Sequence, residues 1–277
     1  MGLKDKIFLF LLFLLAVVIV SPFFSPGFPN THDGQTHVVR LAAFHQALSD
    51  GQFPPRWAGN LAFGFGSSVL SFNFPLSYFL GEIFHLSGFS FEDSIKCVFF
   101  IATVFSGMAM YGFLRQTLTS SISFLGGALY LLAPYRFLDL YVRGEIGESL
   151  MFIFPPLILL TLSKLKEKIS WAKIFFAAAL VCLMILSHQS LAFAFLAMIV
   201  SYSLVMFYPK KRPMTTVLLI IFLGMSLAAF NLFPLFLERQ YTNLDRLIQT
   251  NYRNQFPAIS SLFYSKWSWG PADTGNP

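Results

Sequence analysis

The segment NTHDGQTHVVR, residues 30–40, places a carboxylate, two imidazoles and a guanidinium close after a strongly apolar run. If this segment is helical, Asp33, His37 and Arg40 fall at positions i, i+4 and i+7 and share one face. His32 and His37 are separated by five residues, which is not the i, i+3 or i, i+4 spacing of helical zinc ligands. We therefore predict that Asp33, His37 and Arg40 belong to one site, in which His37 and Arg40 bind a substrate.

Two other interpretations of these residues stay open. Asp33 and His37 could form the ion pair of an ordinary solvated helix face. They also have the spacing of two metal ligands, so a divalent metal completed by a distant His188 or Glu145 is the alternative cofactor. GxSxG, HExxH, P-loop and paired-cysteine motifs do not occur in the sequence, so a covalent nucleophile has no support.

Further binding residues are predicted in GQFPPRWAGNLAFGFG, where Arg56 and Trp57 follow two prolines that stiffen the chain. In APYRFLDLYVRGEIGES, Arg143 stands beside Gly144 and Glu145. Arginine binds phosphate bidentately, and a neighbouring glycine leaves space for a ligand.

His188 lies in LSHQSLAF, between two apolar runs. A histidine at such a turn is usually a helix cap. We nevertheless include His188 with the binding residues, because the turn would bring it to the same surface.

The composition indicates the class of protein to which these residues belong. The chain is 56% hydrophobic and 12% charged, with a mean hydropathy of +0.65, whereas soluble domains carry about 25% charged residues. We predict an all-α polytopic membrane protein. The net charge of +6 does not indicate nucleic-acid binding, because the charges stand in short gaps between apolar runs.

A membrane-spanning helix needs about 20 apolar residues, and the sequence predicts about seven of them. The first is an uncleaved span, with a cleaved signal peptide as the alternative. The run 69–87 carries Asn73 and Glu82 and is predicted to be re-entrant or interfacial. The predicted spans are 7–24, 91–114, 120–134, 148–163, 172–187, 189–208 and 214–237.

The lysine-rich segments KLKEK and PKKRP then face the cytoplasm together with the N-terminus, as the positive-inside rule requires. The opposite face receives a long first outer loop, 25–90, with interfacial helices. One of these helices begins at Asn30 or Thr31 and ends near Gly51. That face also receives a second outer loop, 135–147, and a hairpin at residues 187–190. We expect residues 1–237 to form one transmembrane domain and 238–277 to begin an outer-face region that continues beyond this chain.

The motifs HDG, GQFPPRWAGNLAFGFGSS, FNFPLSYFLG, RGEIGES and SKWSWG give the chain a resemblance to a known group. It resembles bacterial membrane proteins with a "6-pyruvoyl-tetrahydropterin synthase-related" domain, which look like distant relatives of the GT-C glycosyltransferases. The resemblance covers residues 30–150 best.

The resemblance implies a GT-C-like fold and an inverting transfer of a sugar from a polyprenyl-phosphate lipid to an envelope glycan or protein. The reaction would take place on the outer face of the bacterial cytoplasmic membrane. Asp33 matches the catalytic acidic residue of the first outer loop, as general base or metal ligand, and Arg40, Arg56 and Arg143 match residues that hold the lipid phosphate. Many GT-C members carry two adjacent acidic residues, whereas this chain has Asp33-Gly34. The alternatives are a transporter or flippase of a lipid-linked saccharide and a non-catalytic envelope assembly protein.

Overall fold

The computed structural model of the chain describes residues 2–167, 169–208 and 211–243, and within these ranges it contains helices and no β-strand. The predicted all-α class is confirmed. The helices are α1 (Leu3–Val20), α2 (Gly34–Ser49), α3 (Val69–Phe72), α4 (Pro75–Leu86), α5 (Phe91–Leu114), α6 (Ser120–Leu131), α7 (Pro134–Leu138), α8 (Ile146–Met151), α9 (Phe154–Glu167), α10 (Trp171–Ser187), α11 (Gln189–Phe207), α12 (Lys211–Leu227) and α13 (Ala229–Leu237).

Five helical stretches of the described chain are long and apolar enough to cross a membrane, so the prediction of a polytopic membrane protein is confirmed. They are Leu3–Phe24, Phe91–Leu114, Ser120–Arg143, Ile146–Leu165 and Gln189–Phe207. Pro213–Leu227 and Ala229–Leu237 meet at 72° and would form a sixth span if the bent pair crosses as one unit. The α10 helix is apolar but has only 17 residues. The count of seven spans therefore stays a prediction.

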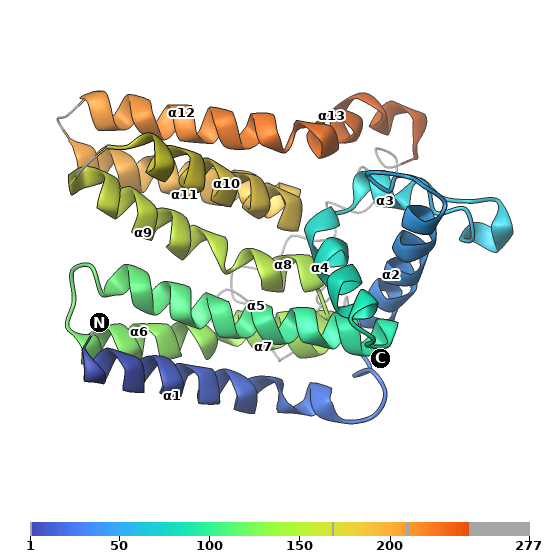
Figure 1. Ribbon diagram of the computed structural model, residues 1–277, viewed down its shortest axis with the longest axis horizontal. Coiled ribbons are helices and arrows are strands. Elements are labelled where there is room, and N and C mark those ends of the chain that lie inside the picture. The colour runs from blue at the N-terminus through green and yellow to red at the C-terminus, as the bar shows by residue number, and fades with distance from the viewer. Residues whose placement is uncertain (1, 168, 209–210, 244–277) are drawn as a thin grey trace, which may run out of the picture.

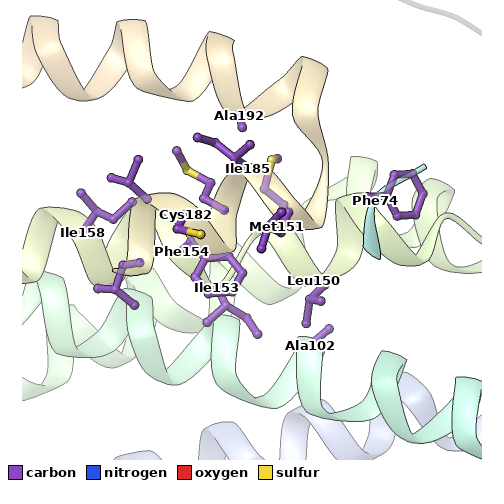
Figure 2. Close-up of a cluster of buried hydrophobic side chains, with 14 of the residues drawn as sticks. Phe74, Ala102, Leu150, Met151, Ile153, Phe154, Ile158, Cys182, Ile185 and Ala192 are labelled. Atoms are coloured by element: carbon purple, nitrogen blue, oxygen red, sulfur yellow. The ribbon is translucent and has the colours of Figure 1, made fainter. Parts of the chain in front are cut away.

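The long helices lie side by side, and the shorter α2, α3 and α4 gather at one end of the bundle (Figure 1). Helix α5 packs against α1, α6 and α9, and α10 packs against α9 and α12. Figure 2 shows Phe154 and Ile158 of α9 among the buried side chains between these two groups, with Cys182 and Ile185 contributed by α10. The apolar side chains thus form one continuous core.

The connection predicted as residues 135–147 is shorter in the structure. After a break at Leu132, Pro134 takes the first position of α7, where its missing N–H costs no hydrogen bond. The π-helical turn Asp139–Arg143 then extends the helical run to Gly144, which has a left-handed backbone (φ 68°). The next helix begins at Ile146. Only Gly144 and Glu145 lie between the two stretches, so most of the charged residues predicted to lie in the loop are on helices.

The 69–87 run forms two short helices, which fits the prediction that it does not cross the membrane. The break between α3 and α4 is stabilised by the side chain of Asn73, whose Oδ1 accepts a hydrogen bond from the Phe74 N–H at 3.0 Å. Twelve residues of α4 rise only about 18 Å, and the apolar part of a bilayer is about 30 Å thick.

The α2 helix differs from the prediction at its start and in its buried face. It begins at Gly34 with Asp33 in the N-cap position, while Thr31 Oγ1 accepts a hydrogen bond from the Gly34 N–H at 3.1 Å. The expected end at Gly51 (φ 85°) is confirmed. His37 and Phe44 are buried, because α2 packs against α4 and α5. The predicted face of Asp33, His37 and Arg40 is therefore split, because the His37 side chain points into the protein.

Candidate functional site

The NTHDG segment and the RGE segment meet at the end of the bundle. The His32 N–H donates to the carbonyl of Val142 at 3.0 Å, and the Asp33 N–H donates to that of Arg143 at 2.8 Å. A Cβ added to Gly144 would lie 2.3 Å from Thr31 Oγ1 and 3.0 Å from the Gly34 nitrogen. This approach requires glycine at 144. Two of the predicted site segments are thereby joined through their backbones.

His37 is fully buried and connects α2 to both neighbouring segments. Its Nδ1 lies 2.9 Å from the Tyr78 hydroxyl, and its Nε2 lies 3.8 Å from Glu145 Oε2. Nε2 has no hydrogen-bond partner among the described residues. Burial of the Tyr78 hydroxyl raises its pKa far above the ordinary value. Tyr78 is therefore a neutral partner that fixes the position of the imidazole.

Glu145 is buried at the N-cap of α8, where its Oε1 accepts a hydrogen bond from the Gly147 N–H at 3.3 Å. Burial by itself would raise the pKa of Glu145, but the neighbouring His37 imidazole and the Gly147 N–H outweigh this effect and lower it. Glu145 is thus an ionised carboxylate that already has partners.

Arg143 is bound by two carboxylates of its own segment, Asp139 and Glu148, which the sequence offers as ordinary ion-pair partners for its arginines. Its Nη1 lies 2.6 Å from Glu148 Oε1 and 3.5 Å from Asp139 Oδ1, and both acidic residues are buried. The Tyr135 hydroxyl donates to Glu148 Oε2 at 2.5 Å, and the Ser149 hydroxyl donates to Asp139 Oδ2 at 2.8 Å. The charge that was predicted to grip phosphate is therefore largely balanced inside the protein.

His188 caps the start of α11, as a histidine at such a turn usually does, and it also lies close to Glu148. Its Nδ1 accepts a hydrogen bond from the Leu191 N–H at 3.3 Å, and its ring stacks on Phe74 with centroids 5.4 Å apart. Its Nε2 lies 3.7 Å from Glu148 Oε1. Burial lowers the pKa of His188, and the attraction of Glu148 and Glu145 only partly opposes this. The imidazole is accordingly neutral at neutral pH.

Asp33 and Arg40 differ from the other charged residues of the site. Neither forms an ion pair with another residue in the described part of the chain, and no side-chain hydrogen bond caps α2 through Asp33. Both side chains are partly exposed. Arg40 lies beside the Tyr78 hydroxyl, which it polarises. Seven residues of helix separate the backbone positions of Asp33 and Arg40 by about 10 Å along the axis.

Arg56 and Trp57 belong to the connection between α2 and α3, which projects beyond these helices (Figure 1). Arg56 Nη2 lies 2.6 Å from Glu238 Oε1, and both side chains are 45% exposed. The Trp57 ring covers Gly66, where a Cβ would come within 2.5 Å of it. The structure gives neither residue a contact with Asp33 or His37 among the described interactions, so they do not join the predicted cluster.

A buried amide network extends from the site to the bend between α12 and α13. Asn73 Nδ2 donates to the Tyr78 hydroxyl at 3.3 Å. The Asn73 carbonyl accepts from Gln189 Nε2 at 3.2 Å and from Asn231 Nδ2 at 3.3 Å. Gln189 Nε2 also donates to Asn231 Oδ1 at 2.8 Å. Sequence reasoning missed this network because its members are more than 40 residues apart, although an asparagine within an apolar run is itself a signal.

No group of three or more His, Cys, Asp or Glu residues in the described chain has a geometry that could hold a metal ion. The arrangement instead combines paired buried charges, which fix the backbone, with one carboxylate and one guanidinium that are partly exposed and form no ion pair among the described residues. Such a pair can accept a proton and bind an anion at neighbouring positions.

Comparisons with known proteins place the chain in a family. The family described as "6-pyruvoyl-tetrahydropterin synthase related domain; membrane protein" matches residues 70–272. FNFPLSYFLG and RGEIGES lie within this match, whereas HDG precedes it. An uncharacterized protein of Lactococcus lactis subsp. cremoris (strain MG1363) is 24% identical over 276 residues, which cover 95% of this chain and 44% of the relative.

This chain thus spans less than half the length of that relative. No solved structure matches the chain. The family match covers most of the sequence and agrees with the apolar helices of the fold. The chain belongs to the 6-pyruvoyl-tetrahydropterin synthase related family of membrane proteins.

Proposed function

We propose that the protein transfers a sugar from a polyprenyl-phosphate donor to a hydroxyl group of an envelope glycan or protein, on the outer face of the bacterial cytoplasmic membrane. The observation that carries this proposal is the Asp33 carboxylate, which has no ion-pair or hydrogen-bonding side-chain partner among the described residues although its backbone is fixed. The other carboxylates around it, Glu145 and Glu148, are partnered.

The chemistry assigned to Asp33 is general-base catalysis. As the acceptor oxygen attacks the anomeric carbon, the bond from that carbon to the donor phosphate oxygen breaks. The acceptor proton passes to Asp33. The bonding electron pair stays on the phosphate oxygen, and polyprenyl phosphate is the leaving group. Displacement from the opposite side inverts the anomeric centre and needs no protein nucleophile. A positioned base contributes about 10²–10⁴-fold to such a rate.

Arg40 is the residue we assign to the leaving phosphate. Arg40 is a partly exposed residue of α2 whose guanidinium contacts the Tyr78 hydroxyl, and within the described chain it forms no ion pair. The backbone positions of the two residues are about 10 Å apart along α2, and we place the sugar between Asp33 and the phosphate. Arg143 is bound to Glu148, so we assign it the supporting role of positioning the Asp33 backbone.

An apolar groove of about 430 Å³ along α12 and α13 supports a donor with a lipid tail. It lies at the bend at Ala228–Ala229. Helix α13, which forms part of its wall, also carries Asn231 of the amide network. Its walls consist of Phe222, Met225, Ser226, Ala229, Leu232, Phe233 and Phe236. Side chains of this kind solvate an isoprenoid chain.

The experiment uses the full chain in vesicles with a polyprenyl-phosphate sugar and a saccharide acceptor, and it measures the glycoside and polyprenyl phosphate that are formed. Asp33→Asn is expected to lower transfer by about 10²–10⁴-fold without changing the amount of folded protein. His32→Gln is the matched control, since His32 is exposed and contributes its backbone. Undiminished transfer by Asp33→Asn would show that Asp33 is not the general base.

Transport of a lipid-linked saccharide is the second candidate, and one observation favours it. Arg136 is 3% exposed within a candidate span, and two of its guanidinium nitrogens have no hydrogen-bond partner in the described residues. It lies over Phe152 at 4.8 Å. Charged residues inside spans commonly mark a substrate path. Movement of the intact lipid-linked sugar across the vesicle, with no polyprenyl phosphate released, would favour this candidate over transfer.

A further inference from the structure

A second concave site lies between α1, α5 and α9. The residues that line it lie at the end of the bundle opposite to α2, α3 and α4, whose positions Figure 1 shows. The site is a groove of about 480 Å³, within the usual range of about 300–1,000 Å³ for ligand pockets. Its apolar wall consists of Leu9, Phe105, Met108, Ala109, Gly112, Leu157 and Leu160. All three helices belong to candidate membrane spans, so in a bilayer this wall faces acyl chains.

The mouth of the groove is polar and positively charged. Arg115, Gln116 and Lys164 line it at the ends of α5 and α9. The Arg115 side chain is 40% exposed, and Lys164 is exposed. Two cations thus stand where an apolar groove reaches the end of its spans, at the depth of lipid headgroups.

The acidic residue in the lining, Asp5, does not cancel both cations. Its Oδ1 accepts hydrogen bonds from the Tyr111 hydroxyl at 2.6 Å, the Ser120 hydroxyl at 2.9 Å and Arg115 Nε at 2.9 Å. Its Oδ2 accepts from the Gly2 N–H at 3.0 Å. The carboxylate is therefore saturated with donors. It holds the arginine in place, and Lys164 adds a second positive charge.

We propose that this groove binds an anionic glycerophospholipid of the surrounding leaflet. One acyl chain would lie along Leu9, Met108 and Leu160, and the lipid phosphate would lie between Arg115 and Lys164. The charge of the mouth selects an anionic headgroup over a zwitterionic one, because a basic pocket between spans attracts negative lipid charge. The apolar wall distinguishes the lipid from free phosphate, which would leave that wall unfilled. The site is separate from Asp33 and does not depend on the proposed transfer reaction.

The test measures lipid retention by the full chain in mild detergent with native mass spectrometry. The probes are phosphatidylglycerol and phosphatidylcholine with the same acyl chains. The protein is expected to retain phosphatidylglycerol more strongly. Lys164→Gln is expected to weaken its binding about fivefold and to leave phosphatidylcholine almost unchanged. Lys6→Gln is the matched control, because Lys6 is an exposed lysine at the same end that does not line the groove.

A second variant tests the apolar wall. A Cβ at Gly112 would lie 3.5 Å from Leu160 Cδ2, which is ordinary contact, so Gly112→Leu fills the groove while Gly112→Ala largely preserves it. The leucine variant is expected to lose both lipids. A thermal melt equal to that of the alanine variant would show that it is folded. Equal retention of the two lipids by the unmodified protein, equal losses in Lys164→Gln and Lys6→Gln, or displacement of the lipid by inorganic phosphate would overturn the proposal.

Discussion

The two ends of the helix bundle each hold an aspartate near the start of a helix, and their surroundings are opposite. Asp5, in the first turn of α1, accepts hydrogen bonds from three side chains and one backbone N–H. Asp33, at the N-cap of α2, has backbone contacts to Arg143 and His37 but no donor side chain among the described residues. A saturated carboxylate can only support the structure, whereas an open one can still accept a proton.

The same contrast extends to the residues around Asp33. Arg143 and Glu148 form a tight pair, but His37 Nε2 is buried without a hydrogen-bond partner in the described chain. Leaving such a group unpaired costs about 1–3 kcal/mol, and native proteins commonly accept this cost at functional sites. The Asp33 end of the bundle therefore combines the Arg143–Glu148 ion pair, which holds the backbone, with polar groups that lack hydrogen-bond partners among the described residues.

The largest loss of stability is expected when the ion pairs of Arg143 with Glu148 and Asp139 are removed. Arg143→Met leaves Glu148 and Asp139 buried without their cation, which should lower the free energy of unfolding by about 3–5 kcal/mol. Arg56→Met removes an ion pair whose side chains are 45% exposed, for which about 0–1 kcal/mol is expected. Thermal unfolding of the two variants in one detergent measures the difference. Equal losses would mean that the Arg143 cluster does not support this end of the bundle.

A smaller loss is expected from the contact between the RGE and NTHDG segments. Gly144→Ala should cost about 1–3 kcal/mol, because it combines a left-handed backbone with a clash against Thr31 Oγ1. Gly51→Ala is the matched control, since Gly51 has φ +85° but open space around it. The comparison separates backbone strain from close packing. A Gly51 variant at least as destabilised as the Gly144 variant would contradict the packing that we describe.

The hydroxyl of Tyr78 should have an effect of about 1 kcal/mol. Tyr78→Phe removes the partner of His37 Nδ1 and of Asn73 Nδ2 and keeps the buried ring. Tyr202→Phe is the control, because Tyr202 is 38% exposed and its ring packs against Phe113. Hydrogen exchange of the α2 amides would show whether loosening is confined to the Asp33 end, as we expect. Unchanged hydrogen exchange at that end would mean that the Tyr78 hydroxyl does not hold α2 in position.

The smallest effect is a dependence of stability on pH through His188. Its pKa is lowered in the folded protein, so the unfolded chain binds the proton more readily and stability is lost as pH falls below about 6.5. His188→Asn retains a side-chain acceptor for the α11 cap and should flatten the difference in melting temperature between pH 7.5 and 5.5. His32→Asn should leave the difference intact. A flattening by His32→Asn alone would exclude His188 as the titrating group.

Much of the helical plan could be predicted from the sequence, because apolar runs and lysine-rich gaps are local properties. The meeting of Asp33, His37, Arg143, Glu145 and His188 was also expected, since a span returns its ends to one surface. The extension of the third stretch to Arg143 was not predicted, since the predicted span ended at residue 134. In the fold, Pro134 occupies the first position of a new helix that continues the same stretch.

The partners of the charged residues could not be predicted. Whether Arg143 faces a ligand or Glu148 depends on the packing of α8 against its neighbours, which no local pattern encodes. The pairing of Arg56 with Glu238 joins residues 182 positions apart. Burial of His37 follows from the contact of α2 with α4 and α5. The predictions for residues 244–277 lie outside the described residues.

The most direct test of the contrast between the two aspartates measures sugar transfer and thermal unfolding on the same preparations of Asp33→Asn and Asp5→Asn. Our account predicts that Asp33→Asn loses transfer and retains its melting temperature. It predicts that Asp5→Asn melts at a lower temperature and retains transfer per folded molecule. Full transfer by Asp33→Asn, or a melting temperature lowered as much as that of Asp5→Asn, would contradict the account.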